Sequence, residues 1–217
     1  KDDSIARSII FIGNHSNQGD LNFLEKIKFS IPKIFPGFLL NKYVMILFNK
    51  IYYFFHEHDK KFKQSLDNFF YPLDGMNGWN NLYGRSGFIQ IQILIKDHNF
   101  EEIIKEILKF FQDKGQLSFL STLKELGPGN ANYLSFPDKG YTLTLDLKMN
   151  KNIKNIYYEF ELLLEKYKTK VYLTKDSFMS EKYFKERYKN LNKFKEIKKK
   201  YDPSKLIASN QSKRLGL

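Results

Sequence analysis

The sequence contains no cysteine. This absence excludes disulfide bonds, zinc sites built from thiolates, iron–sulfur clusters and cysteine nucleophiles. Long apolar runs are missing too: the richest stretch, residues 43–55, is broken by Asn49 and Lys50, whereas a membrane-spanning helix needs roughly 18 apolar residues in a row. We therefore expect a chain that does not span a membrane, and the lack of cysteine is compatible with the reducing cytoplasm.

Standard catalytic signatures are also lacking. The sequence has no Gly-x-Gly-x-x-Gly fingerprint, no phosphate-binding P-loop, no Gly-x-Ser-x-Gly and no His-Glu-x-x-His. His56 and His58 flank Glu57 and could bind a metal, but such a charged stretch is more typical of a solvated surface. We expect no metal site and chemistry that needs none.

Arginine is scarce: only Arg7, Arg85, Arg187 and Arg214 occur among the 36 basic residues. Arginine is the side chain best suited to paired hydrogen bonds with phosphates and bases, so the net charge of +12 is a poor indication of nucleic-acid binding. Most of the excess charge falls in residues 181–217. A solvated lysine-rich helix face is the favoured interpretation, an anionic membrane surface or a phosphate-bearing substrate is the alternative, and no nucleic acid is expected.

Two stretches alternate as strands that each have one polar face. Gln90 and Gln92 fall on one side of the first, and Thr142 and Thr144 on one side of the second. Apolar residues recur at helical spacing between the strands, and the first such helix is capped by Asn99 and stopped by Gly115. The predicted elements are strands at 87–95, 117–126, 141–147 and 171–173 and helices at 99–115, 152–167 and 180–201.

The order β-α-β-β-α-β predicts an α+β fold of the split βαβ, ferredoxin-like kind. Such a fold has an antiparallel sheet with both helices on one face, which leaves a polar-lined face as a natural wall for a ligand. A further lysine-rich helix begins at Ser180 and is stopped by Asp202-Pro203. Residues 1–70, with breaks at Pro32 and Pro36, indicate little.

Aromatic and amide side chains are dense in residues 69–88, which include the only tryptophan, Trp79. Sugar rings stack on aromatic faces while their hydroxyls pair with amides and carboxylates, so the segment suits a sugar, with Asp74 and Asn80 among its polar residues. The alternative is a turn started by Pro72 and Asp74 whose aromatic side chains fill the core. The residues alone leave both interpretations open.

A series of short motifs, in order along nearly the whole chain, resembles one enzyme family. The motifs are Tyr71-Pro72-Leu73-Asp74, Gly78-Trp79-Asn80, Tyr83-Gly84, residues 87–92, Ser118-Phe119-Leu120, Lys124, Gly127, Asn130, residues 134–137, Asp146, residues 174–177, Asp202-Pro203 and Arg214-Leu215. They are similar to the matching stretches of the decaprenylphosphoryl-ribose oxidases, flavoenzymes of the vanillyl-alcohol oxidase superfamily. The ordered set is more specific than any single motif in it.

The resemblance implies an FAD-dependent oxidoreductase that removes hydride from a sugar hydroxyl carbon, with a polyprenyl-phosphate- or nucleotide-linked pentose as substrate. In this family the flavin lies mainly in an N-terminal domain. Residues 1–170 would then be a substrate-binding cap domain that lacks its start, and residues 171–217 a segment that returns to an absent FAD-binding domain. Because Lys1-Asp2-Asp3 has neither an initiator Met nor a signal pattern, we expect a piece of a longer protein, inactive alone.

The same resemblance implies the site residues. Lys175 resembles the family lysine beside flavin and substrate, where a cation stabilises negative charge on the reduced ring; by spacing alone it is an ordinary surface lysine. Gln90, Gln92 and Lys124 match positions that face the substrate pocket, and the two threonines match its lining strand. The predicted substrate-binding residues are Asp74, Asn80, Gln90, Gln92, Lys124, Thr142 and Thr144.

Some positions depart from the family pattern. Tyr71 and Asn81 replace a frequent His and Arg, and Thr144 stands where some members carry Cys, which leaves the substrate open. A second candidate is an aldonolactone oxidase of the same superfamily, and the non-enzymatic alternative is a binding module for an anionic glycan or surface. The expected partners are a lipid-phosphate-linked sugar, a reductase and the anionic inner face of a membrane, which the cytoplasmic protein would contact peripherally.

Overall fold

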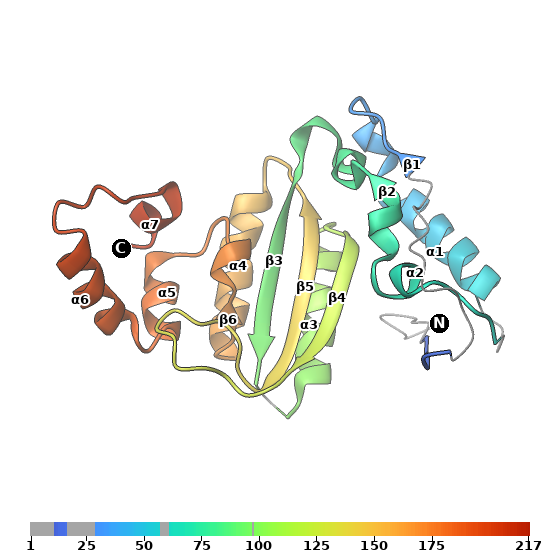
Figure 1. Ribbon diagram of the computed structural model, residues 1–217. Helices are drawn as coiled ribbons and strands as arrows, with labels where there is room; N and C mark the ends of the chain where they lie inside the picture. Colours follow the sequence, from blue (N-terminus) through green and yellow to red (C-terminus); the bar gives the residue numbers. More distant parts are fainter. Residues whose placement is uncertain (1–10, 17–28, 57–60, 97) are drawn as a thin grey trace. The chain divides into compact units, whose positions relative to one another are not determined.

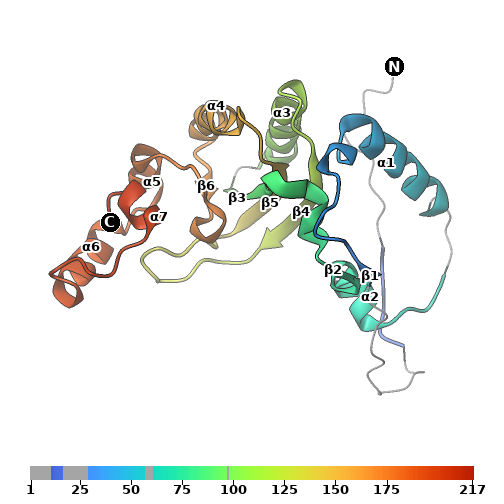
Figure 2. The same ribbon diagram turned by 90° about the horizontal axis from the view of Figure 1, so that it is seen from above.

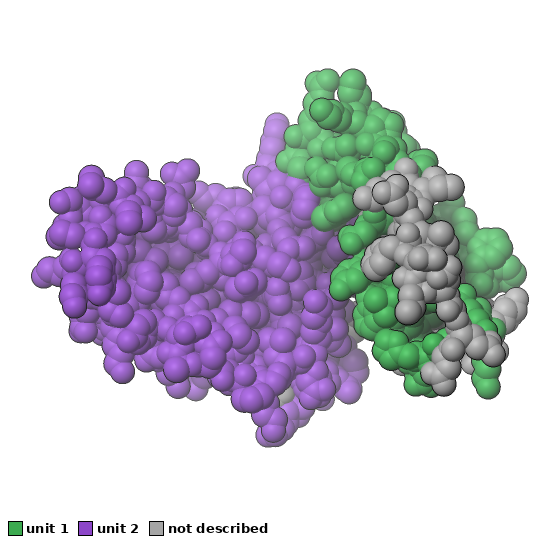
Figure 3. All heavy atoms as spheres, viewed as in Figure 1, with its two compact units in different colours: residues 1–87 green, residues 88–217 purple. Residues whose placement is uncertain are grey.

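The structure is a computed structural model that describes residues 11–16, 29–56, 61–96 and 98–217. The chain divides into two compact units, residues 1–87 and residues 88–217 (Figure 3). The predicted division at residue 170, between a substrate-binding part and a segment that returns to a flavin domain, concerns function and stays a prediction.

Unit 1 consists of short elements and one longer helix. Helix α1 (Lys42–His56) takes up the apolar stretch of the sequence, and α2 (Leu66–Phe70) begins at Ser65, whose hydroxyl accepts a hydrogen bond from the Asn68 N–H. Two very short strands pair in parallel. These strands and the 3-10 helices of the unit are β1 (Phe29–Ser30), η1 (Gly37–Leu39), η2 (Pro72–Gly75), β2 (Met76–Asn77) and η3 (Trp79–Ser86).

Aromatic packing accounts for part of the segment that was considered for sugar binding. Tyr83 is buried, and Trp79 contacts it edge to face with ring centroids 6.4 Å apart. Gly84 has a φ of +68°, and a Cβ built on it would lie 2.9 Å from the Cα of Gly37. The close approach of η1 and η3 therefore requires glycine at both positions.

Unit 2 confirms the predicted element order and the α+β class. It contains an antiparallel four-stranded sheet in the order β4-β5-β3-β6. The pairing of β4 with β5 is interrupted by a register shift between Ser118 and Ser121. The elements are β3 (Phe88–Ile95), α3 (Phe100–Asp113), β4 (Ser118–Leu126), β5 (Gly140–Lys148), α4 (Ile153–Lys166) and β6 (Lys170–Val171).

Helices α3 and α4 lie on the same side of the sheet (Figures 1 and 2). The core fills the space between them, because apolar residues alternate along the strands and recur every three or four residues along the helices. Its main members are Ile89, Ile91, Ile93, Ile95, Leu143, Leu145 and Leu147 from the strands and Ile103, Ile107, Phe111, Ile153, Ile156, Tyr157, Phe160 and Leu164 from the helices.

The intervening residues of β3 and β5 form the opposite, polar face of the sheet. The connection between β4 and β5, residues 127–139, runs on this side (Figure 2). It is held there by contacts with the far edge of the sheet: the Lys170 ammonium donates to the Ser135 carbonyl, and the Phe136 ring lies 4.7 Å from that of Tyr172. The sheet thus has helices on one side and a long loop on the other (Figure 2).

The C-terminal part differs from the prediction. The last strand ends at Val171, because the next residues form the 3-10 helix η4 (Leu173–Lys175). The prediction of a single lysine-rich helix at 180–201 is wrong, because the chain forms two helices there, α5 (Glu181–Arg187) and α6 (Leu191–Tyr201). A last helix, α7 (Asn210–Arg214), follows.

Tyr188 explains the break between α5 and α6. Its backbone leaves the helical region, at φ −105° and ψ 84°, and its buried hydroxyl donates a 2.5 Å hydrogen bond to the Val171 carbonyl. Asn190 then occupies the N-cap of α6, a position that asparagine favours over a helix interior. The predicted start of this region is confirmed, because the Ser180 hydroxyl accepts a hydrogen bond from the Tyr183 N–H at 3.1 Å.

Candidate functional site

The polar face of the sheet in unit 2 brings together most of the predicted site residues. The antiparallel register sets Gln90 opposite Asp146 and Gln92 opposite Thr144, and it sets Lys124 opposite Thr142. Directly opposite residues share a face of the sheet, so these side chains line one surface. The alternation of polar residues in the two strands, read from the sequence, is confirmed.

Hydrogen bonds fix the side chains of this face. The amide nitrogen of Gln90 donates to the Asp146 carboxylate at 2.6 Å, and that of Gln92 donates to the Thr142 hydroxyl at 2.9 Å. The two glutamines are half-buried, whereas Thr142, Thr144 and Asp146 are buried. Each amide nitrogen uses one of its two N–H groups in these bonds, and the glutamine amide oxygens are acceptors that a bound molecule can use.

Lys175 lies in η4, beside this face, and it is half-buried. Burial lowers the pKa of its ammonium below the usual value; the Asp146 carboxylate opposes this shift and the Lys124 ammonium adds to it. The three charged side chains therefore come close enough to influence one another, although they belong to β4, β5 and η4. A partly desolvated cation beside amides suits the binding of an electron-rich or anionic group.

Asp176 fixes the turn that carries Lys175. Its carboxylate is fully buried, accepts hydrogen bonds from the N–H groups of Phe178 and Met179 at 3.1 and 2.8 Å, and pairs with Arg214 at 2.7 Å. In addition, the Gln211 side chain donates to the Leu173 carbonyl at 2.6 Å. Helix α7 thus returns to the turn and holds the backbone on both sides of Lys175.

Asp74 and Asn80 belong to unit 1, whereas the other six predicted residues belong to unit 2. Asp74 lies in η2 and Asn80 in η3, and both side chains are exposed. The structure therefore places these two residues at the surface of their own unit.

Sequence analysis did not include Asp146 and Lys170 among the site residues. Asp146 continues the alternation of Thr142 and Thr144, so the period of two could have identified it. Lys170 shares the polar face through its pairing with Leu94, and burial lowers its pKa while its ammonium lies 4.5 Å from the centre of the Tyr188 ring. No sequence pattern predicts this contact, because Tyr188 lies in the segment that joins α5 to α6.

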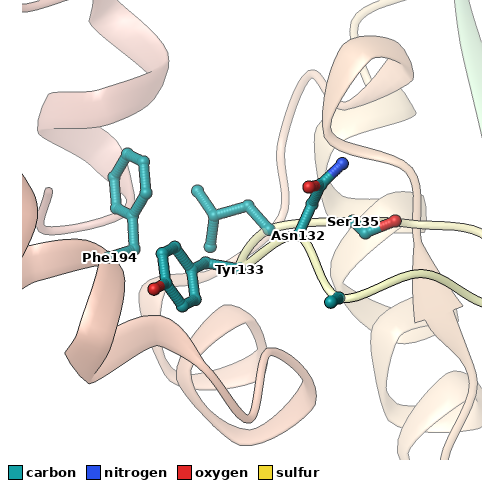
Figure 4. Close-up of a pocket in the computed structure, with 6 residues that line it drawn as sticks. Asn132, Tyr133, Ser135 and Phe194 are labelled. Atoms are coloured by element: carbon teal, nitrogen blue, oxygen red, sulfur yellow. The ribbon is translucent and has the colours of Figure 1, made fainter.

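A surface hollow of about 570 Å³ lies elsewhere in unit 2, between the β4–β5 connection and α6 (Figure 4). Its walls carry no charged group, and the predicted site residues are not among the residues that line it. The residues that line the hollow are Ala131, Asn132, Tyr133, Leu134, Ser135 and Phe194.

Two absences hold for the part of the chain that the structure describes. No helix there has the length and apolar content needed to cross a membrane. No three His, Asp or Glu side chains gather there in a way that could hold a metal ion. His58, one of the two histidines considered for a metal, lies outside the described residues.

Known proteins resemble this chain over much of its length. Residues 133–215 match the family model of D-arabinono-1,4-lactone oxidase. Over 188 residues the chain is 30% identical to the decaprenylphosphoryl-beta-D-ribose oxidase of Mycolicibacterium smegmatis, which covers 87% of this chain and 41% of that protein. It is also 27% identical over 121 residues to a Streptomyces coelicolor protein named only as uncharacterized, covering 55% of this chain and 33% of the relative. The chain thus spans less than half the length of these relatives.

Proposed function

We propose a function from the premise that this chain is the C-terminal region of an FAD-linked oxidase, similar to decaprenylphosphoryl-ribose oxidase. The complete protein would oxidise a hydroxyl of a sugar, with a polyprenyl-phosphate- or nucleotide-linked pentose as its substrate. The observation that carries the proposal is the 30% identity over 188 residues, which amount to 87% of this chain.

The side chains of the polar face have distinct proposed roles. The amide oxygens of Gln90 and Gln92 accept hydrogen bonds from sugar hydroxyls and so orient the ring. Lys124 lies on an exposed strand at the edge of the sheet, where a cation suits the phosphate of a linked sugar. Thr142 and Thr144, being buried, support the glutamines and shape the floor of the site.

Lys175 is the proposed catalytic residue. The Asp176–Arg214 pair fixes the turn that carries it, and the charges of Asp146 and Lys124 act on its ammonium, so that the turn is formed before any ligand binds. A fixed cation in a partly desolvated site stabilises negative charge that develops on a neighbouring group during reaction. This residue therefore faces the reacting atoms in the proposed site.

The chain fits FAD only in part. The Lys175 ammonium suits contact with the flavin, but the sequence holds no glycine-rich loop of the kind that binds nucleotide phosphates. We propose that residues outside this chain hold most of the cofactor. When bound, FAD supplies the acceptor for the hydride that leaves the sugar.

A lactone oxidase is the second candidate. The match of residues 133–215 to the D-arabinono-1,4-lactone oxidase model favours it. An aldonolactone carries hydroxyls like those of a pentose but no phosphate, so it would use the glutamines and leave Lys124 without a role. The effect of Lys124 on substrate affinity therefore separates the two candidates.

The test uses the complete gene product that contains this chain. We expect a yellow protein. Under anaerobic conditions a polyprenyl-phosphate pentose should bleach its flavin absorbance. Bleaching by an aldonolactone but not by the pentose would favour the second candidate. Lys175→Ala should slow bleaching at least about a hundredfold, because removal of a preorganised charge costs this much, whereas the exposed Lys151→Ala should leave the rate unchanged. A colourless product would contradict the proposal of an oxidase and would favour the non-enzymatic alternative, a binding module for an anionic glycan or surface.

A further inference from the structure

Helix α1 of unit 1 exposes an unusual amount of apolar surface. Tyr43, Phe54 and Phe55 are 82%, 66% and 73% exposed. The other large apolar residues exposed along this helix are Val44, Ile46, Leu47, Phe48, Ile51 and Tyr52. Large exposed apolar patches of this kind mark sites of interaction with a partner or a membrane.

Most of the exposed apolar residues gather on one side of α1. Residues 44, 47, 48, 51 and 55 recur at helical spacing and share a face, and all of them are exposed. The opposite face contains Lys42, Met45, Asn49 and Tyr53, and it holds the least exposed side chains, the buried Met45 and the half-buried Tyr53. The helix thus contacts its own unit through its more polar face and presents its apolar face outward.

The segment that contains α1 carries lysines and no carboxylate within residues 29–56. Residues 29–56 contain Lys33, Lys42 and Lys50 but no Asp or Glu. All three lysines are exposed. An apolar face rich in Phe and Tyr, on a helix that also carries Lys42 and Lys50, matches an anionic bilayer surface, where rings enter the headgroup region and ammonium groups meet lipid phosphates.

We propose that α1 is a membrane-binding helix that lies in the surface of an anionic lipid bilayer with its apolar face in the lipid. With 15 residues it is about 22 Å long, too short for the roughly 30 Å hydrocarbon core, so it lies along the surface and does not cross it. This proposal does not depend on the oxidase activity, because it rests on α1 alone.

The experiment is vesicle flotation of the complete gene product, in which any residues that cover α1 are present. We expect the protein to float with vesicles of phosphatidylglycerol and phosphatidylcholine in equal parts, and less with pure phosphatidylcholine. Leu47→Glu together with Ile51→Glu should lower binding at least about tenfold for each residue, because each change removes the favourable free energy of moving an apolar side chain from water into lipid. Leu162→Glu, at a comparably exposed leucine of α4, should leave binding unchanged.

A second pair of variants tests the charge without changing the apolar face. Lys42→Ala and Lys50→Ala should each weaken binding to the anionic vesicles about fivefold, and raised salt should remove this difference. Circular dichroism establishes that each variant is folded.

Three outcomes would overturn the proposal. The wild-type protein could stay out of both vesicle types, which means that other residues or a second copy cover α1; gel filtration without vesicles tells these apart. The variants of α1 could float as well as the wild type, which assigns the attachment to another surface. Equal binding to neutral and anionic vesicles would exclude the role of the lysines. Flavin bleaching is measured separately, so failure here leaves the oxidase proposal untouched.

Discussion

The charge of Lys175 depends on its neighbours, which act in opposite directions. Burial and the Lys124 ammonium disfavour its protonated form, while the Asp146 carboxylate favours it. Asp146→Asn should therefore lower the pKa of Lys175 further, and Lys124→Met should raise it toward the usual value. The two variants must move the titration in opposite senses if the three side chains form one site.

This titration is measured by NMR after reductive methylation of the lysines with ¹³C-formaldehyde, and Lys175→Arg identifies the signal. Lys151→Met, a change at an exposed position in the turn before α4, serves as the control and should leave the Lys175 signal where it is. Identical titration curves in all variants would show that the charges of Asp146 and Lys124 do not affect the pKa of Lys175. This result would contradict the proposal that the three side chains form one site.

At this scale the sequence predicted which side chains share a face of the sheet, but not how segments far apart in the sequence influence one another. Gln90, Gln92, Thr142 and Thr144 were correct members of one face because strand alternation assigns faces directly. Burial lowers the pKa of Lys175, and the charges of Asp146 and Lys124, about 30 and 50 positions away, act on it in opposite directions; no local pattern carries that information.

The turn at η4 and the helix α7 form one connected element through Asp176. Asp176→Asn removes the charge that pairs with the partly exposed Arg214 and weakens the acceptor of two backbone N–H groups. We expect the free energy of unfolding to fall by about 2 to 3 kcal/mol, somewhat less than the full cost of breaking a buried pair.

Urea unfolding measures this loss, and Asp138→Asn provides the matched control. Asp138 pairs with Lys96 at an exposed position, so its replacement should change the free energy of unfolding by less than about 1 kcal/mol. Equal effects of the two substitutions would mean that α7 is not anchored to the turn.

Helices and strands with a clear period were predicted well, and breaks imposed by tertiary contacts were not. The apolar spacing of α3 and α4 and the alternation of β3 and β5 agree with the structure within two residues at each end. The residues of α5 and α6 fit a single helix equally well, because Phe184, Tyr188 and Leu191 keep one spacing. The hydrogen bond from Tyr188 to Val171 decides the break, and it joins two elements that periodicity treats separately.

For the whole molecule, the division into two units has an experimental consequence. Every residue of the main core cluster lies between Ile89 and Leu215, so unit 2 contains its complete core. We expect residues 88–217 expressed alone to unfold cooperatively in urea and to keep the Lys175 titration of the longer chain. A gradual transition, or a Lys175 signal shifted to the usual value, would show that unit 1 is required for the fold of the site.

The position of β4 at the end of the sheet has a consequence for solubility. Among the described residues its pairing is with β5, so its other edge presents backbone N–H and C=O groups to any strand of another molecule. Charged side chains and irregularities are the features by which natural sheets resist such edge-to-edge association. The exposed Lys124 and Glu125, together with the register shift near Ser118, supply both. We therefore expect Lys124, the lysine proposed to meet a substrate phosphate, also to oppose association of β4 with strands of other molecules.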